Sequence, residues 1–441
     1  MVESTPTKFR AIIVGAGPVG LYLAHALCRA NIDYVVLEQH DTVLRYQGAG
    51  VLLYPQTLRL LDQIGLYEKA EKDFIINHTH TDLLTGNGRV IKSTPLWSIL
   101  AERHAYPMAG LSRGQLIALL YENLPEKETR VKAGAAVLDV KVHEKGVKVH
   151  LKDGRTEEGS ILIGVDGVYS KTRQIMQQLA QTPPDTWPMT ATYQGLYGCF
   201  HSCHGFEPGT FYQSRGSGIV SQIMVGADRG HFAILRPIPP TAGLKRYTTE
   251  DRDRLAEELS NISVGPGVRF QDMWELTVKE TAAMVNQEEG YCDKWYHERV
   301  VLAGDAVHKA TSVTGLGVNT GINSAAVLAN ELYRTLKSEP DPGTGAIEDA
   351  FARYQQIRDN EASRLHAVGR KQIRGVTWET WADWFFDRFV NPWIGVDRVV
   401  EIIGKLIKRG QILEYVPFKD RKVQVPWNHS PTAQVIRDPL S

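Results

Sequence analysis

Three glycines and one acid near the start of the chain have a spacing that suits phosphate and ribose binding. Gly15, Gly17 and Gly20 form a G-x-G-x-x-G pattern, and Glu38 follows 18 residues after the last glycine. Such glycines allow a tight turn and bring backbone amides close to a pyrophosphate at the positive end of a helix. An acid at this distance can accept the hydroxyls of an adenosine ribose. The pattern predicts a dinucleotide site, and it does not separate FAD from NAD.

The elements around these glycines are those that such a site requires. Phe9–Val14 is a short apolar run, Leu21–Ala30 is helical in composition, and Asp33–Glu38 is a second apolar run that ends in the acid. The order predicts a parallel β-α-β unit with the glycine turn at the ligand-binding edge. A β-α-β unit that binds nothing is the alternative, because glycine turns also serve folding alone.

Two more acids follow apolar runs much later in the chain. Ile161–Val165 leads directly into Asp166 and Gly167, and the run 299–303 leads into Asp305. The carboxyl ends of parallel strands form the edge at which open α/β folds bind ligands. Both acids are therefore expected at the same edge as the glycine turn.

Two helix starts complete the set of candidate ligand contacts. Gly315 and Gly317 precede a helix predicted to begin near residue 319, and bare amides there suit a ring carbonyl that becomes anionic. Arg113 lies in the first turn of another helix, whose capping box is Ser112 and Gln115. A cation there opposes the helix dipole, so Arg113 is either a solvated surface residue or a side chain that reaches the ligand.

Composition excludes several classes of protein. The 441 residues carry 50 Lys and Arg against 50 Asp and Glu, and this zero net charge argues against a nucleic-acid partner. Four cysteines in so long a chain indicate a reducing compartment. Met1–Lys8 is polar, unlike a signal peptide, and no apolar run reaches 20 residues. We therefore expect a cytoplasmic protein.

Together these motifs resemble the group A flavoprotein monooxygenases, which are single-component, FAD-dependent enzymes with the fold of p-hydroxybenzoate hydroxylase. The resemblance covers about residues 9–335. It implies an α/β fold, with a Rossmann-like FAD-binding domain, a β-sheet substrate domain and a C-terminal helical region. The β-rich texture of residues 182–291 suits the substrate domain.

The resemblance and the changes in expected secondary structure along the chain divide it into four parts. Residues 1–180 form the FAD-binding domain, and 82–100 within it contribute to the substrate sheet. Residues 181–290 form the β-rich substrate domain, 291–340 return to the FAD-binding domain, and 341–441 form the C-terminal helical region.

The tail resembles a narrower group. Leu413–Pro417, Lys419-Asp420-Arg421 and Val425-Pro426-Trp427 are similar to the C-terminal signature of fungal monooxygenases that act on meroterpenoids, indole diterpenes and prenylated indole alkaloids.

The resemblance assigns roles to the residues singled out above. Glu38 would hold the adenosine ribose, Arg113 the ribityl and phosphate region, and Asp305 the ribityl or pyrophosphate part. Asp166 with Gly167 matches a motif linked to both FAD and nicotinamide contacts. The residues beside the flavin ring would be Gly50, Val51, Gly315, Gly317 and Val318.

The chain also departs from the family pattern. Related enzymes usually carry a proline where Ser312 stands and often a glutamine where Leu316 stands. An active-site arginine is often found where Tyr193 and Gln194 stand, and Tyr212 aligns loosely with a tyrosine given an active-site role. Tyr193, Gln194 and Tyr212 are the catalytic candidates. Ordinary sheet packing is the alternative for both tyrosines.

The family chemistry implied is oxygen transfer to a small apolar substrate. NAD(P)H reduces FAD, O2 adds to form a C4a-hydroperoxyflavin, and one oxygen atom epoxidises or hydroxylates an electron-rich site. The substrate expected is a prenylated indole, terpenoid or aromatic intermediate of fungal secondary metabolism. The chain has no second G-x-G-x-x-G between a strand and a helix, which fits NAD(P)H as a transient donor. A redox-neutral cyclase or isomerase and a non-catalytic FAD-binding protein are the alternatives.

Two stretches remain. Cys199, His201, Cys203 and His204 lack a second ligand pair, so no metal is predicted.

The stretch 378–393 is rich in Trp and Phe, and core packing is the role that we predict for it. A lid over the substrate is one alternative. Peripheral contact through 377–409 with a membrane, such as that of the endoplasmic reticulum, is another. Nothing in the sequence indicates the oligomeric state.

Overall fold

The computed structural model describes residues 9–45, 50–73, 75–182, 189–201, 204–216, 218–417, 419 and 421–429. The polar start Met1–Lys8, Cys203 of the cysteine–histidine cluster and Asp420 of the tail signature lie outside these residues.

A six-stranded sheet forms the centre of the molecule, and segments far apart in sequence build it. Strand β1 (Arg10–Val14) pairs in parallel with β2 (Asp33–Leu37) on one side and with β12 (Ile161–Gly164) on the other. Its apolar runs are buried because helices cover both faces of such sheets. The remaining strands are β21 (Val300–Leu302), β20 (Tyr296–His297) and β8 (Val131–Lys132), which give the order β20-β21-β12-β1-β2-β8.

Helices pack against this sheet and against one another. Helix α1 (Pro18–Arg29) contacts α5 (Arg113–Glu122) and α10 (Gly317–Ser338). The other helices of residues 50–180 are α2 (Pro55–Gln63), α3 (Tyr67–Asp73), α4 (Leu96–His104), α6 (Lys127–Arg130) and α7 (Lys171–Leu179). The Rossmann-like α/β fold class expected from the sequence is thereby confirmed.

Two small antiparallel sheets accompany the central one. The first has the order β11-β10-β9, and the second has the order β3-β7-β4 and carries residue 50 toward the ligand-binding edge. Their strands are β9 (Val137–His143), β10 (Gly146–Leu151), β11 (Thr156–Gly159), β3 (Gly50–Leu53), β4 (Ile76–His78) and β7 (Met108–Ser112).

An eight-stranded sheet forms the second large layer. Its order is β22-β19-β13-β16-β15-β14-β5-β6. Two of its strands come from the first hundred residues, and the Asn87-Gly88 pair lies in the turn that joins them. The strands are β5 (His80–Thr85), β6 (Val90–Thr94), β13 (Met189–His201), β14 (Thr210–Gly216), β15 (Ile219–Val225), β16 (Arg229–Ala242), β19 (Thr277–Tyr291) and β22 (His308–Lys309).

A second hydrophobic core lies on one face of this sheet. It includes residues of α8 (Thr249–Glu258) and α9 (Phe270–Glu275), two helices that the sequence analysis did not predict. The short strands β17 (Ser263–Gly265) and β18 (Val268–Arg269) lie beside them.

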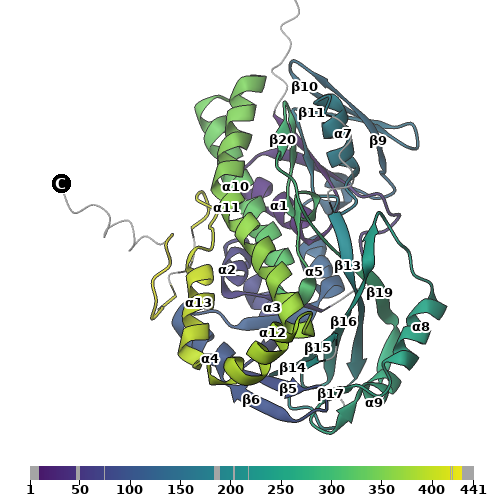
Figure 1. Cartoon of the computed structure of the whole chain (residues 1–441). Coiled ribbons are helices and arrows are strands. Elements are labelled where there is room, and N and C mark those ends of the chain that lie inside the picture. Colours follow the sequence, from purple (N-terminus) through teal and green to yellow (C-terminus); the bar gives the residue numbers. More distant parts are fainter. Residues whose placement is uncertain are drawn as a thin grey trace, which may run out of the picture.

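The C-terminal region is helical and wraps the other two parts. Helix α11 (Thr344–Thr377) runs beside α10 and leads to α12 (Trp381–Phe385) and α13 (Val396–Lys408), as Figure 1 shows. A π-helical turn, η3 (Phe386–Val390), and a short 3-10 turn, η4 (Asn391–Trp393), join the last two helices.

The prediction that the aromatic stretch packs in the core was wrong. Trp381 is 78% exposed and Trp393 is 86% exposed, and most other aromatics of the stretch are also exposed. Aromatic side chains usually pack in protein interiors. Here these side chains are exposed, because no other described element covers them. Among the described residues, no helix is long and apolar enough to cross a membrane.

Candidate active site

The glycine turn after β1 leaves the N-terminus of α1 open. Gly17 caps the helix without a side-chain hydrogen bond, and no acid lies in the first turn. Gly15 has φ +112°, a conformation that L side chains rarely adopt. A Cβ at Gly20 would lie 2.0 Å from the carbonyl oxygen of Gly15, so only glycine fits there. The free amides and the helix dipole make this turn an anion site.

Glu38 is held at the end of β2, beside this turn. Its side chain is buried, and its two carboxylate oxygens accept hydrogen bonds from the amides of Ala16 (2.9 Å) and His40 (3.0 Å). These bonds fix the carboxylate where the ribose of a bound dinucleotide is expected.

Arg113 brings a positive charge to the same turn from α5. A Cβ at Gly17 would lie 3.8 Å from Nη2 of Arg113. Burial and the nearby Arg45 lower the pKa of the Arg113 guanidinium, whereas Asp305 and Glu38 oppose that shift. Its side chain has no hydrogen bond or ion pair to any described residue, so its donors face the cavity. Such a cation suits a phosphate oxygen.

Asp305 joins this group from the turn after β21. Its carboxylate lies 2.7 Å from Nζ of Lys309. Burial alone raises the pKa of Asp305, but Lys309, His308 and Arg113 outweigh burial and lower it. Asp305 is therefore ionised at neutral pH. The pKa of Arg113 thus responds to both Glu38 and Asp305, although the three residues are far apart in sequence.

Asp166 has a different position. Its oxygens accept hydrogen bonds from the hydroxyl of Ser170 (2.5 Å) and from the amide of Thr172 (2.9 Å), which cap the start of α7. Gly167, and not Asp166, lines the cavity, and a Cβ at Gly167 would have no neighbour within 4 Å. The Asp-Gly pair therefore shapes the edge of the cavity through its backbone.

The loop before α10 closes the opposite side of the cavity. Gly315 turns the chain with φ +65°, and the Tyr54 hydroxyl donates to the carbonyl of Thr314 at 2.9 Å. Asn319 donates to the carbonyls of Leu52 and Gly315, which ties the loop to β3. Because α10 has no capping side chain and no acid in its first turn, its amides remain available to an anionic ring.

One cavity of about 900 Å³ connects these two ends. Gly17, Arg113 and Asp305 line one part, and Gly50, Val51 and residues 312–318 line the next. The remaining wall is largely apolar and includes residues of the eight-stranded sheet, α4 and α13. Its apolar residues include Leu83, Leu96, Trp97, Phe211, Met224, Phe232, Val396, Val399 and Ile403.

Comparison with known proteins shows which family has this arrangement. A family model described as an FAD binding domain matches residues 8–365. The chain belongs to this family. The FAD-dependent monooxygenase srdH of Neurospora crassa is 42% identical over 95% of this chain and 98% of its own length. The FAD-dependent monooxygenase ausM of Penicillium brasilianum is 30% identical over 94% and 89% of the two chains.

A solved structure has the same fold. HpxO of Klebsiella pneumoniae, in complex with FAD and uric acid, superposes with a TM-score of 0.77 at 22% identity and covers 90% of this chain and 96% of its own. These findings confirm the resemblance to the group A flavoprotein monooxygenases and, among them, to fungal enzymes of secondary metabolism. The protein is an FAD-dependent monooxygenase, and its small-molecule substrate and O2 follow from that activity.

The cavity of this flavoprotein fits FAD on its own geometry. A Cβ added at Gly317 or at Gly167 would meet no other part of the chain within 4 Å, and one at Gly17 would meet only Arg113. Bare backbone therefore lines the cavity at three separate places, as close approach of an extended ligand requires. The free guanidinium of Arg113 and the two open helix N-termini suit its phosphates and its ring.

The structure does not bring the three catalytic candidates of this monooxygenase to the main cavity. The hydroxyls of Tyr193 and Thr377 share a hydrogen bond of 3.1 Å. Tyr193 lines a smaller cavity beside α12. Gln194, with its amide oxygen turned toward Arg236, accepts two hydrogen bonds from that guanidinium at 2.5 and 2.8 Å. Tyr212 is buried in the second core, where its hydroxyl accepts from the amide of Glu207 at 2.9 Å.

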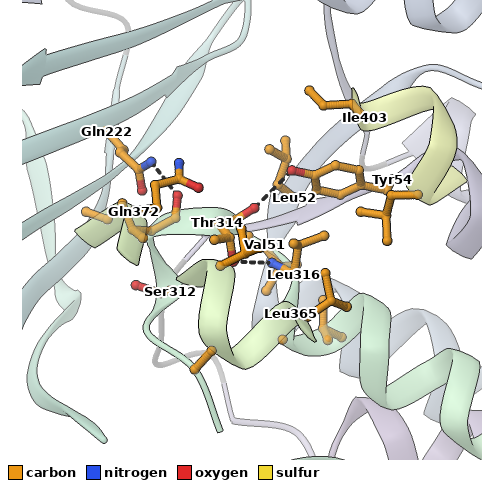
Figure 2. Close-up of a pocket in the computed structure, with 18 of the residues that line it drawn as sticks. Val51, Leu52, Tyr54, Gln222, Ser312, Thr314, Leu316, Leu365, Gln372 and Ile403 are labelled. Atoms are coloured by element: carbon orange, nitrogen blue, oxygen red, sulfur yellow. Dashed lines mark hydrogen bonds between the residues drawn. The ribbon is translucent and has the colours of Figure 1, made fainter. Parts of the chain in front are cut away.

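The sequence analysis missed polar residues that do line the cavity. Tyr197 lies on β13, and its hydroxyl is 2.8 Å from Oγ of Ser312. Gln222 donates to the carbonyl of Val313 at 2.8 Å (Figure 2). Gln287 accepts a hydrogen bond from the amide of Ser312 at 3.0 Å. The even spacing of Tyr193 and Tyr197 in a strand was the available signal, since it places both on one face.

Proposed function

We propose that this enzyme epoxidises or hydroxylates a prenylated indole, terpenoid or aromatic intermediate of fungal secondary metabolism, with NAD(P)H as the electron donor. The observation that carries the proposal is the apolar part of the cavity, which adjoins the loop before α10. Trp97, Phe211 and Phe232 from one side and Ile403 from the other enclose it. Such a wall favours a substrate with a large apolar surface.

The polar groups of this apolar part are mostly satisfied by the protein itself. Arg215 lies 2.5 Å from the carboxylate of Asp387, and Lys92 donates to the carbonyl of Ile394. Asp387 therefore neutralises Arg215, whereas Lys92 keeps its charge and has one donor satisfied by a neutral carbonyl. The ion-paired Arg215 supports an uncharged substrate beside it.

We assign the cofactor contacts as follows. Glu38 would hold the adenosine ribose, and Arg113 with Asp305 would flank the pyrophosphate and ribityl part. When bound and reduced, FAD supplies the chemistry that transfers one atom of O2 to the substrate. The flavin ring would lie against the backbone of Gly50, Val51, Gly315, Gly317 and Val318, with Asp166 and Gly167 at the cavity edge.

The chain would support this chemistry by excluding water and by stabilising charge. The apolar wall keeps the reacting region dry, and the open N-terminus of α10 stabilises negative charge on an adjacent ring. Burial raises the pKa of the Tyr197 phenol, so this hydroxyl stays protonated at neutral pH and can donate a hydrogen bond inside the cavity.

Oxygen-isotope labelling tests the proposal directly. The purified yellow holoprotein is incubated with NADPH or NADH, a prenylated indole or a terpenoid, and ¹⁸O2. We expect substrate-dependent NAD(P)H oxidation and one labelled oxygen atom in the product. Product that carries no label would contradict oxygen transfer.

A redox-neutral cyclase or isomerase is the second candidate function. The observation that favours it is the Tyr197–Ser312 hydroxyl pair, because it provides a hydrogen-bond donor where related enzymes usually carry a proline. Product formation without NAD(P)H and O2 would support this candidate. Retention of FAD without reduction by NADPH or NADH would instead support a non-catalytic FAD-binding protein.

A further inference from the structure

The aromatic side chains of α12 and of the two turns that follow it form an exposed surface, which we name the aromatic face. It consists of Trp381, Trp384, Phe385, Phe386, Phe389, Val390 and Trp393, all of which are exposed. Soluble proteins rarely leave so many large apolar side chains together in water, and such surfaces mark sites of interaction.

The outward orientation of this face is fixed by its polar inner side. Asp387 is the buried residue of the turn η3. It pairs with Arg215 of β14 and accepts a hydrogen bond from the indole of Trp378 at 3.0 Å and from Asn391 at 3.0 Å. Lys92 of β6 holds the following turn through the carbonyl of Ile394. Because these polar contacts face inward, the aromatic rings must face outward.

The charges without an ion pair near the aromatic face in sequence are mostly positive. Residues 378–393 themselves carry three acids against Arg388, but residues 364–409 contain nine Lys and Arg against five Asp and Glu. Four of those acids, Glu379, Asp387, Asp397 and Glu401, lie in ion pairs. Arg370, Lys371 and Arg388 are exposed and form no ion pair with any residue that the structure describes. Exposed Trp and Phe beside unpaired basic side chains are the composition of surfaces that rest in the headgroup region of a bilayer.

We propose that the aromatic face docks the enzyme on the surface of a membrane that contains anionic lipids. The rings would enter the headgroup and acyl boundary, and the basic side chains would contact lipid phosphates. A second copy of the chain is disfavoured as the occupant, because two such positive surfaces repel each other.

The face also adjoins the active-site cavity, because residues of its own segment and of α13 line that cavity. Asn391 and Val396 line the cavity, and Ile402 of α13 lines it while remaining 63% exposed. Docking would therefore place the opening against lipid, where an apolar substrate dissolves. This last step, unlike docking itself, rests on the proposed function.

Vesicle binding tests the proposal without substrate or NAD(P)H, so its outcome is independent of the reaction. The full-length holoprotein is sedimented with vesicles of phosphatidylcholine alone or mixed with phosphatidylserine, and its tryptophan fluorescence is quenched with brominated lipids. We expect binding to the mixed vesicles that weakens with salt. The variant W381S/F386S/F389S/W393S should lose affinity roughly tenfold or more.

The control variant is L138S, which removes an exposed leucine of β9, a strand that lies well away from α12 (Figure 1). It should bind like the natural protein, and the flavin content and thermal midpoint of both variants establish that they fold. Absence of sedimentation with either vesicle would overturn the proposal. So would equal binding by the serine variant, or a dimer in light scattering that this variant converts to monomer.

Discussion

The hydroxyl of Tyr197 lies 2.8 Å from Oγ of Ser312 and joins β13 of the eight-stranded sheet to the loop before α10. The amide of Ser312 is in turn held by Gln287 at 3.0 Å. The position of this loop, which we assign to the flavin ring, therefore depends on a side chain of the sheet that lines the cavity.

We expect Tyr197→Phe to uncouple NAD(P)H oxidation from product formation. Loss of the hydroxyl removes one hydrogen bond, with a net cost of about 1 kcal/mol in unfolding free energy. It also frees the Ser312 hydroxyl to bind water beside the flavin position. The measurement is the ratio of product formed to NAD(P)H oxidised, and it should fall several-fold. Tyr212→Phe is the matched control, because Tyr212 lies in the second core. An equal fall in both variants would contradict the role of Tyr197.

Two glycines of the same motif should respond differently to alanine. A Cβ at Gly20 would lie 2.0 Å from the Gly15 carbonyl oxygen, so Gly20→Ala should prevent folding or yield insoluble protein. At Gly17 the nearest atom would be Nη2 of Arg113 at 3.8 Å, so Gly17→Ala should fold. Its methyl group should nevertheless weaken FAD binding by blocking close approach to the phosphates. Circular dichroism and flavin content measure the two effects. A folded Gly20→Ala protein would show that the turn relaxes more than this geometry allows.

Arg113→Ala should lower the affinity for FAD roughly tenfold to a hundredfold, because a charge-assisted hydrogen bond contributes about 1.5–3 kcal/mol. Fluorescence titration of the apoprotein with FAD gives the dissociation constant. Arg155→Ala is the control, since Arg155 is an exposed residue paired with Asp153. Unchanged affinity in the Arg113 variant would show that its guanidinium does not reach the cofactor.

Local patterns predicted the backbone around the glycine turn well. The β1-α1-β2 unit forms around the glycine turn, and the capping box of Ser112 and Gln115 is present with both hydrogen bonds. These features depend on residues close in sequence, whose spacing fixes the backbone. Strand-end acids such as Asp305 were also predictable, because the edge of a parallel sheet gathers them.

The substrate side was less predictable because it depends on long-range packing. Tyr193 and Tyr197 have equivalent positions by strand alternation, yet only Tyr197 lines the main cavity. Tyr193 instead contacts Thr377 at the end of α11 and lines the smaller cavity. Likewise, the aromatic stretch is exposed because its one buried anchor, Asp387, pairs with Arg215, which lies 172 residues away in sequence.

Buried histidines should make the enzyme less stable in mild acid. Burial and Arg229 lower the pKa of His231 to about 4, and burial lowers that of His308 to about 4 as well. In the unfolded chain the pKa is about 6.5, so below that pH the unfolded state binds more protons. Stability should therefore be complete above pH 6.5 and should fall by up to about 1.4 kcal/mol per pH unit for each histidine as the pH decreases toward 4.

Thermal denaturation between neutral pH and pH 5 measures this loss. The variant His231→Leu should flatten the profile, because leucine takes up no proton in the unfolded state. The control His143→Leu, which changes an exposed histidine, should leave the slope as it is. If the thermal midpoint of the natural protein did not change between neutral pH and pH 5, these buried histidines would not be neutral in the folded state.

The pair between Arg215 and Asp387 should control the order of the segment that carries the aromatic face. Asp387→Ala leaves a largely buried guanidinium without its partner, and such a loss costs roughly 3 kcal/mol. Because Asp387 also binds Trp378 and Asn391, the cost should appear as local opening of residues 378–393. Hydrogen exchange of this segment should accelerate, while exchange in β1 and α1 stays slow. Asp383→Ala is the matched control, since it removes an acid that caps α12 and pairs with no cation within the described residues. Equal acceleration in both variants would mean that capping, and not the buried pair, holds the segment in place.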